Sequence, residues 1–159
     1  MIFLGCMESA SDLLPRYARA RLLRYAMLWL TLLFVSPLYA EPVAIIHAGE
    51  PHAKIERKIL RAAFSMTLQA WPDGQPLTVF VFRDDDTLHQ QFCRKVLGVL
   101  PYTLRRNWDR LLFSGAAQAP IIVDSPEEML RRVAATPGSL GYIEKERINE
   151  SVSIVEVIQ

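Results

Sequence analysis

The sequence predicts a single α/β domain with a mostly parallel sheet flanked by helices, and three observations lead to this prediction. A chain of 159 residues has room for one domain of ordinary size. Its hydrophobic share of 51% and charged share of 22% are typical of a chain that folds around a core. Short apolar runs alternate with segments of helical periodicity, as expected of strands joined by crossover helices.

Residues 1–40 have the features of a secretory signal peptide. Four arginines between residues 16 and 24 precede an uncharged apolar run over 25–35, and a small residue, Ala40, stands before Glu41. Basic residues hold such a segment on the inner side of the membrane while the apolar run enters the translocon. The run of 11 residues is short against the roughly 20 that span a bilayer, so we expect cleavage by a Sec-type route. A retained anchor is the alternative, and membrane contact is expected only in that case.

The remaining segment, residues 41–159, is expected to be one exported domain. It carries 14 Lys and Arg against 15 Asp and Glu, because residues 1–40 hold four of the basic and two of the acidic residues. A domain of this charge does not fit a nucleic-acid binder that neutralises phosphates. Its single cysteine, Cys93, cannot close a disulfide within the domain, so the core must stabilise it.

The first half of this domain predicts two strands and two helices. The apolar run 42–47 indicates a strand, and the stripe of Ile55, Ile59 and Phe64 indicates a helix over 54–66. The turn at 71–76 leads into Leu77–Phe82, where β-branched and aromatic residues predict a central strand. A second helix is expected to open at Thr87 and to end near Gly98.

The second half predicts two further helices and three strands. Pro101 begins a helix with Trp108 on its apolar face, and 120–123 indicates a short strand. Ser125 and Glu128 form a capping box at the start of the next helix, which ends before Thr136-Pro137-Gly138. The segments 140–143 and 152–157 are the closing strands, so the predicted order is β-α-β-α-α-β-α-β-β. Ligands of such sheets bind beyond the carboxyl ends of the strands. The segment Arg83-Asp84-Asp85-Asp86-Thr87, which follows the central strand, is therefore the first candidate for a ligand site.

Three segments together resemble the phosphate-type periplasmic substrate-binding proteins of ABC transporters, in the type II periplasmic binding protein superfamily, and in particular their short single-lobe relatives. The segments are Trp71-Pro72-Asp73-Gly74, then Trp108 with Phe113-Ser114-Gly115 and Pro120, and Thr136-Pro137-Gly138-Ser139-Leu140-Gly141-Tyr142. The resemblance extends roughly from Val43 to Ile143, and its last segment is the most specific. It implies one lobe of a two-lobed periplasmic binding fold, with no enzymatic activity and no cofactor.

The resemblance also implies a ligand site at Arg83, Asp86 and Thr87 for phosphate or another small anion. In phosphate binders an Arg after the central strand is followed by Ser-Gly-Thr at a helix start; Arg83 fits the Arg position, and Thr87 fits the first hydroxyl position of that motif. Asp84, Asp85 and Asp86 depart from this pattern, because their carboxylates satisfy the helix dipole and repel an anion.

The sequence therefore leaves two hypotheses for the function. One is a solute-binding module for ABC-type uptake or sensing, with an ABC permease or a membrane-bound sensor as its partner. The other is a periplasmic interaction protein that keeps the fold without a working ligand site.

Other chemistries find weaker support in the sequence. No nucleophile with a paired base stands out, Cys93 is expected to be a buried thiol, and Asp86 is expected to cap its helix. His47, His52 and His89 are expected in loops and on the surface rather than at a metal. Trp71 and Trp108 are expected in the core.

Overall fold

The computed structural model describes residues 41–116 and 118–158 of the chain. The predicted signal peptide over residues 1–40 lies outside the described residues, so its prediction stays untested. No helix within the described part has the length and apolarity needed to cross a membrane.

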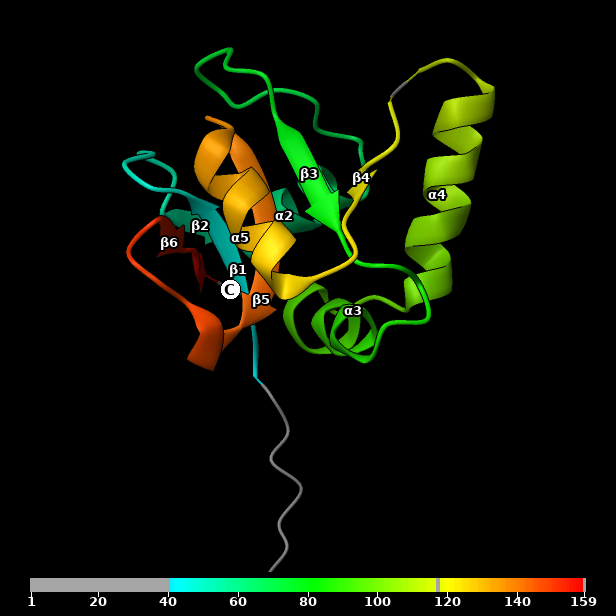
Figure 1. Ribbon diagram of the computed structural model, residues 1–159. Coiled ribbons are helices and arrows are strands. Elements are labelled where there is room, and N and C mark those ends of the chain that lie inside the picture. Colours follow the sequence, from blue (N-terminus) through cyan, green and yellow to red (C-terminus); the bar gives the residue numbers. More distant parts are fainter. Residues whose placement is uncertain (1–40, 117, 159) are drawn as a thin grey trace, which may run out of the picture. The chain divides into compact units, whose positions relative to one another are not determined.

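A mixed five-stranded sheet forms the centre of the described domain (Figure 1). Its spatial order is β4 (Ile121–Ile122), β3 (Thr78–Val81), β5 (Ser139–Glu144), β1 (Pro42–His47) and β6 (Val152–Ile154). The strand β3 pairs in parallel with β4 and β5, whereas β1 pairs antiparallel with both β5 and β6. Four strands therefore share one direction and only β1 opposes them, which confirms the predicted mostly parallel α/β class.

Helices cover both faces of the sheet. The side chain of Gly141 in β5 would point at α5 (Pro126–Ala135), since a Cβ there would lie 2.6 Å from Met129 Sδ. The next residue, Tyr142, points to the opposite face and packs on Phe92, with ring centroids 4.1 Å apart. Phe92 ends α3 (Thr87–Phe92), and α2 (Arg57–Phe64) contributes Phe64 to the same cluster. The core thus has two layers, one on each face of the sheet.

The helix α4 (Pro101–Phe113) joins the layer that contains α2 and α3 through Trp108. The indole Nε1 of Trp108 donates to the carbonyl oxygen of Phe64 at 2.8 Å, and its side chain is buried. The other tryptophan, Trp71, is also buried, and its Nε1 donates to the carbonyl oxygen of Gly138 at 2.9 Å. Both tryptophans are therefore core residues, as predicted. The hydrogen bond of Trp71 also joins segment 71–74 to segment 136–142, two of the three segments on which the resemblance rests.

Gly138 lies where these segments meet and is required there. Its φ of 73° is in the left-handed region, and a Cβ on it would lie 2.6 Å from the carbonyl oxygen of Pro76. Only glycine avoids both the backbone strain and the collision.

Two elements differ from the prediction. The expected helix over 54–66 begins only at Arg57, because Lys54–Glu56 forms the strand β2. The expected closing strand 152–157 divides into β6 in the main sheet and β7 (Glu156–Ile158), which pairs in parallel with β2. Both differences come from pairing between segments about 100 residues apart, which local periodicity does not encode.

The remaining helical segments follow their end signals. The helix α3 continues as a π-helical segment, Cys93–Leu97, and ends at Gly98 with a left-handed φ of 67°. At α5 the hydroxyl of Ser125 accepts from the Glu128 amide at 3.1 Å, which is the predicted cap. The Glu128 carboxylate reaches one residue further back than a capping box requires, to the amide of Asp124 at 3.0 Å. A short 3-10 segment, Lys145–Arg147, follows β5.

Candidate functional site

A pocket lies at the carboxyl end of β3, where the sequence directed attention. We call it the strand-end pocket; it has a volume of about 330 Å³. Its lining comes from the segment after β3 and the segment after β4: Phe82, Arg83, Asp85, Asp86, Thr87, Val123 and Asp124. The two parallel strands end side by side, and the Val123 amide donates to the carbonyl oxygen of Val81 at 2.9 Å. Parallel pairing therefore gathers these residues at one edge of the sheet.

The three residues predicted for ligand binding, Arg83, Asp86 and Thr87, all line this pocket. Asp86 is the N-cap of α3, because its Oδ1 accepts from the amides of Leu88 at 2.7 Å and His89 at 3.0 Å. Those backbone amides are the groups that a helix start offers to an anion. In this chain they already hold a carboxylate.

Acidic side chains outnumber the one arginine in the strand-end pocket. Asp85, Asp86 and Asp124 line it together with Arg83, whose side chain is 69% exposed and lies 3.5 Å from Asp85 Oδ1. The remaining carboxylate of the loop, Asp84, turns away and accepts from Arg105 Nε at 2.6 Å. At ordinary pH the charged lining carries a net negative charge, which disfavours a phosphate dianion.

A buried hydrogen-bonded cluster lies directly beneath the loop. Tyr142 Oη accepts from the amide of Phe82 at 2.8 Å and lies 2.6 Å from Nδ1 of His89. The phenol and Nδ1 share one hydrogen bond, whose donor is set by the imidazole tautomer. The other ring nitrogen of His89, Nε2, is 3.5 Å from Cys93 Sγ. All three side chains are buried, so the prediction for Cys93 is confirmed and the surface position expected for His89 is wrong.

The cluster does not form an activated nucleophile. Burial raises the pKa of the Cys93 thiol to about 12, and Asp84 adds to the effect. Burial lowers the pKa of His89 below its ordinary value of 6.5, although Asp84 and Asp86 oppose this. A neutral thiol beside a neutral imidazole is the reverse of the thiolate–imidazolium pair that cysteine enzymes use.

The low pKa of His89 predicts a pH dependence of stability. The unfolded chain takes up a proton on this imidazole near pH 6.5, whereas the folded protein resists it. The unfolded state therefore binds more protons below that pH, and the free energy of unfolding falls as the medium becomes acidic. Urea denaturation at about pH 7.5 and about pH 5.5 measures the decrease, which should be smaller in His89→Gln. An equal decrease in both proteins would contradict this assignment.

The three histidines have separate environments. His47 Nδ1 lies 3.4 Å from the carbonyl oxygen of Val133, and His52 stacks on Trp71 with ring centroids 4.2 Å apart. His89 belongs to the buried cluster. Across residues 41–116 and 118–158, no three His, Cys, Asp or Glu side chains gather as a metal ion would require.

Comparison with solved structures identifies the class of fold. An ABC-type phosphate transport receptor from Vibrio cholerae superposes with a TM-score of 0.57 at 14% identity, over 73% of this chain and 45% of the receptor. A phosphate ABC transporter substrate-binding protein from Clostridium perfringens, with bound phosphate, gives 0.57 at 16% identity over 73% and 44%. PstS from Borrelia burgdorferi gives 0.51 at 16% identity over 73% and 46%. No family model and no curated protein matches the sequence.

The chain thus has the fold of one part of the ABC-type phosphate-binding proteins. It spans less than half the length of the relatives that it matches. The resemblance read from the sequence is confirmed at the level of the fold, and these neighbours are binding proteins rather than enzymes.

Proposed function

We propose that this chain is an exported, non-enzymatic binding module of solute-binding-protein type, which does not hold phosphate tightly in the strand-end pocket and acts by binding a protein partner. An ABC permease or a membrane-bound sensor fits this role, because phosphate transport receptors share the fold. The observation that carries the proposal is the Asp86 carboxylate on the amides of Leu88 and His89. A phosphate could reach these amides only by displacing the Asp86 carboxylate, which is part of the chain itself.

The rest of the strand-end pocket supports the same conclusion. A bound phosphate would lie near Asp85 and Asp124 with only Arg83 to oppose their charge. Two unit charges about 4 Å apart interact by about 1 kcal/mol in water and about 4 kcal/mol near a protein surface, so the added repulsion is large enough to decide affinity. The region that matches this domain makes up less than half of each of these proteins, 45% of the Vibrio cholerae receptor and 44% of the Clostridium perfringens protein.

Weak recognition of a small anion is the second candidate function. Arg83 and Thr87 line the strand-end pocket together, and the guanidinium of Arg83 is largely exposed. A guanidinium and a hydroxyl are suitable donors to phosphate oxygens. This candidate requires a second component to close over the pocket.

Export is proposed from residues 1–40, whose basic and apolar segments fit a Sec-type signal peptide removed before Glu41. The proposed location is the periplasm.

One preparation tests the proposal in two ways. The full sequence is expressed in a bacterial host, the periplasmic fraction is collected, and the intact mass of the purified protein shows whether residues 1–40 have been removed. Calorimetric titration with inorganic phosphate then measures affinity. We expect a Kd of about 1 mM or weaker, equivalent to less than about 4 kcal/mol of binding free energy. Micromolar binding that Arg83→Gln abolishes would overturn the proposal in favour of a phosphate receptor.

A further inference from the structure

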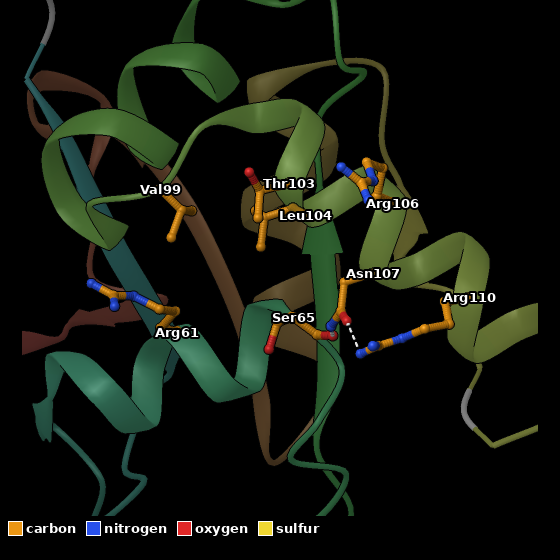
Figure 2. A pocket seen from close by; sticks show the side chains of 8 residues that line it. All are labelled: Arg61, Ser65, Val99, Thr103, Leu104, Arg106, Asn107 and Arg110. Atoms are coloured by element: carbon orange, nitrogen blue, oxygen red, sulfur yellow. Dashed lines mark hydrogen bonds between the residues drawn. The ribbon is translucent and has the colours of Figure 1, made fainter.

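A second hollow, remote in sequence from Arg83 to Thr87, lies between α2 and α4. We call it the basic groove; it has a volume of about 380 Å³. Its residues come from the end of α2, the segment before α4, and one side of α4: Arg61, Ser65, Val99, Thr103, Leu104, Arg106, Asn107 and Arg110 (Figure 2). The lining has three arginines and no acidic side chain.

These arginines have no acidic partner in the part of the chain that the structure describes. Within residues 41–116 and 118–158, no carboxylate comes within 4.0 Å of the side-chain nitrogens of Arg61, Arg106 or Arg110. The adjacent Arg105 differs, since it binds Asp84 at 2.6 Å. Guanidinium groups left unpaired in a hollow are free to form bidentate hydrogen bonds with carboxylates of another molecule.

Two of the arginines are held in place by the protein. Arg61 Nε donates to the carbonyl oxygen of Leu97 at 2.9 Å, which leaves its terminal nitrogens available. Arg110 donates to Asn107 Oδ1 at 2.6 Å, and Asn107 in turn donates to the carbonyl oxygen of Ser65 at 2.6 Å. Fixing a long side chain before binding reduces the entropy lost when a ligand arrives.

The arrangement of the groove selects the kind of ligand. Figure 2 shows Arg61 on one side and Arg106 with Arg110 on the other, so they do not converge on one point as a single phosphate would require. Val99 lies between them and is partly exposed, so it offers apolar surface, whereas Leu104 is buried. The exported part has more acidic than basic residues, which disfavours a nucleic acid. Spaced negative charges flanking an aliphatic side chain describe an acidic peptide.

We propose that the basic groove binds an acidic segment of a partner protein, with two or more carboxylates separated by an aliphatic residue. The inference rests on the proposed function, in that it specifies the chemistry of the partner. Carboxylates of the segment bind Arg61 on one side and Arg106 and Arg110 on the other, while its aliphatic side chain packs on Val99.

Fluorescence anisotropy with a labelled peptide tests this proposal. The probe is Glu-Glu-Leu-Glu-Leu-Glu, its control has Gln at every Glu, and the protein is expressed from the full sequence. We expect the acidic peptide to bind at least about tenfold more tightly than its neutral counterpart, a difference of about 1.4 kcal/mol. Arg106→Gln/Arg110→Gln should weaken its binding by about tenfold or more, because charge-assisted hydrogen bonds contribute about 1.5–3 kcal/mol.

The matched control is Arg131→Gln/Arg132→Gln, which removes two charges from α5 on the other face of the sheet. It should leave the peptide affinity within about twofold of the unsubstituted protein, since only the exposed Arg132–Glu128 pair is lost. Equal losses in the two double variants would overturn the proposal, as would absence of peptide binding. Displacement of the peptide by an equal concentration of inorganic phosphate, or by vesicles of phosphatidylglycerol, would overturn it in favour of a small anion or a membrane. The phosphate titration of the strand-end pocket is independent of all these outcomes.

Discussion

Replacing Tyr142 by Phe is expected to lower the free energy of unfolding by about 2–4 kcal/mol. The phenol oxygen accepts from the Phe82 amide at 2.8 Å and contacts His89 Nδ1 at 2.6 Å, inside a fully buried cluster. Without it, a backbone N–H and an imidazole nitrogen lose their partners where water cannot replace them. Each buried group left unsatisfied costs about 1–3 kcal/mol.

Urea denaturation measures the free energy of unfolding of Tyr142→Phe and of the control variant Tyr102→Phe. Tyr102 lies on α4 with 59% of its surface exposed, so its loss of a hydroxyl should change stability by less than about 0.5 kcal/mol. The aromatic stacking of residue 142 on Phe92 is retained in the variant. If the free energy of unfolding of Tyr142→Phe falls by less than about 1 kcal/mol, the hydrogen bonds of Tyr142 with Phe82 and His89 do not stabilise the domain as proposed.

The same hydroxyl connects the core to the strand-end pocket. The hydroxyl accepts a hydrogen bond from the amide of Phe82, which is the residue before Arg83. It also contacts His89, which lies in the first turn of α3, the helix that Asp86 caps. Both ends of the loop 83–86 are therefore fixed from below by one buried side chain.

Local chemistry explains why much of this region could be predicted from the sequence. The cap at Asp86 follows from an acidic residue placed before an apolar stripe, and the structure confirms it. The position of Arg83, Asp86 and Thr87 in one pocket follows from the central strand Leu77–Phe82, because residues after such a strand gather at its carboxyl end. In each case a short stretch of chain contains the whole signal.

Features that depend on distant segments could not be predicted in this way. The burial of His89 requires Tyr142 as its partner, from a strand 53 residues away. A local hint existed, since His89 and Cys93 are one helical turn apart and point to the same side. The basic groove has even less local signal, because Arg61 belongs to α2 whereas Arg106 and Arg110 belong to α4. On the sequence alone they are indistinguishable from solvated surface charges.

The acidic loop is also the point at which the second large effect is expected. The double substitution Asp85→Ser/Asp86→Gly creates the order Ser-Gly-Thr over residues 85–87, the motif that the resemblance to phosphate binders implies for a helix start. It removes two carboxylates from the strand-end pocket and frees the amides of Leu88 and His89 for a ligand. The loss of the cap costs little, because glycine is only a few tenths of a kcal/mol poorer than Asp at that position.

We expect this variant to bind inorganic phosphate about a hundredfold more tightly than the unsubstituted protein, since each charge removed near the anion contributes about 1.4 kcal/mol. Calorimetric titration at moderate ionic strength measures the change. The control Glu146→Gln/Glu150→Gln alters the net charge equally at exposed positions outside the pocket, and should change phosphate affinity by less than about threefold because salt screens distant charges. An unchanged affinity in Asp85→Ser/Asp86→Gly would show that the acidic loop does not limit phosphate affinity.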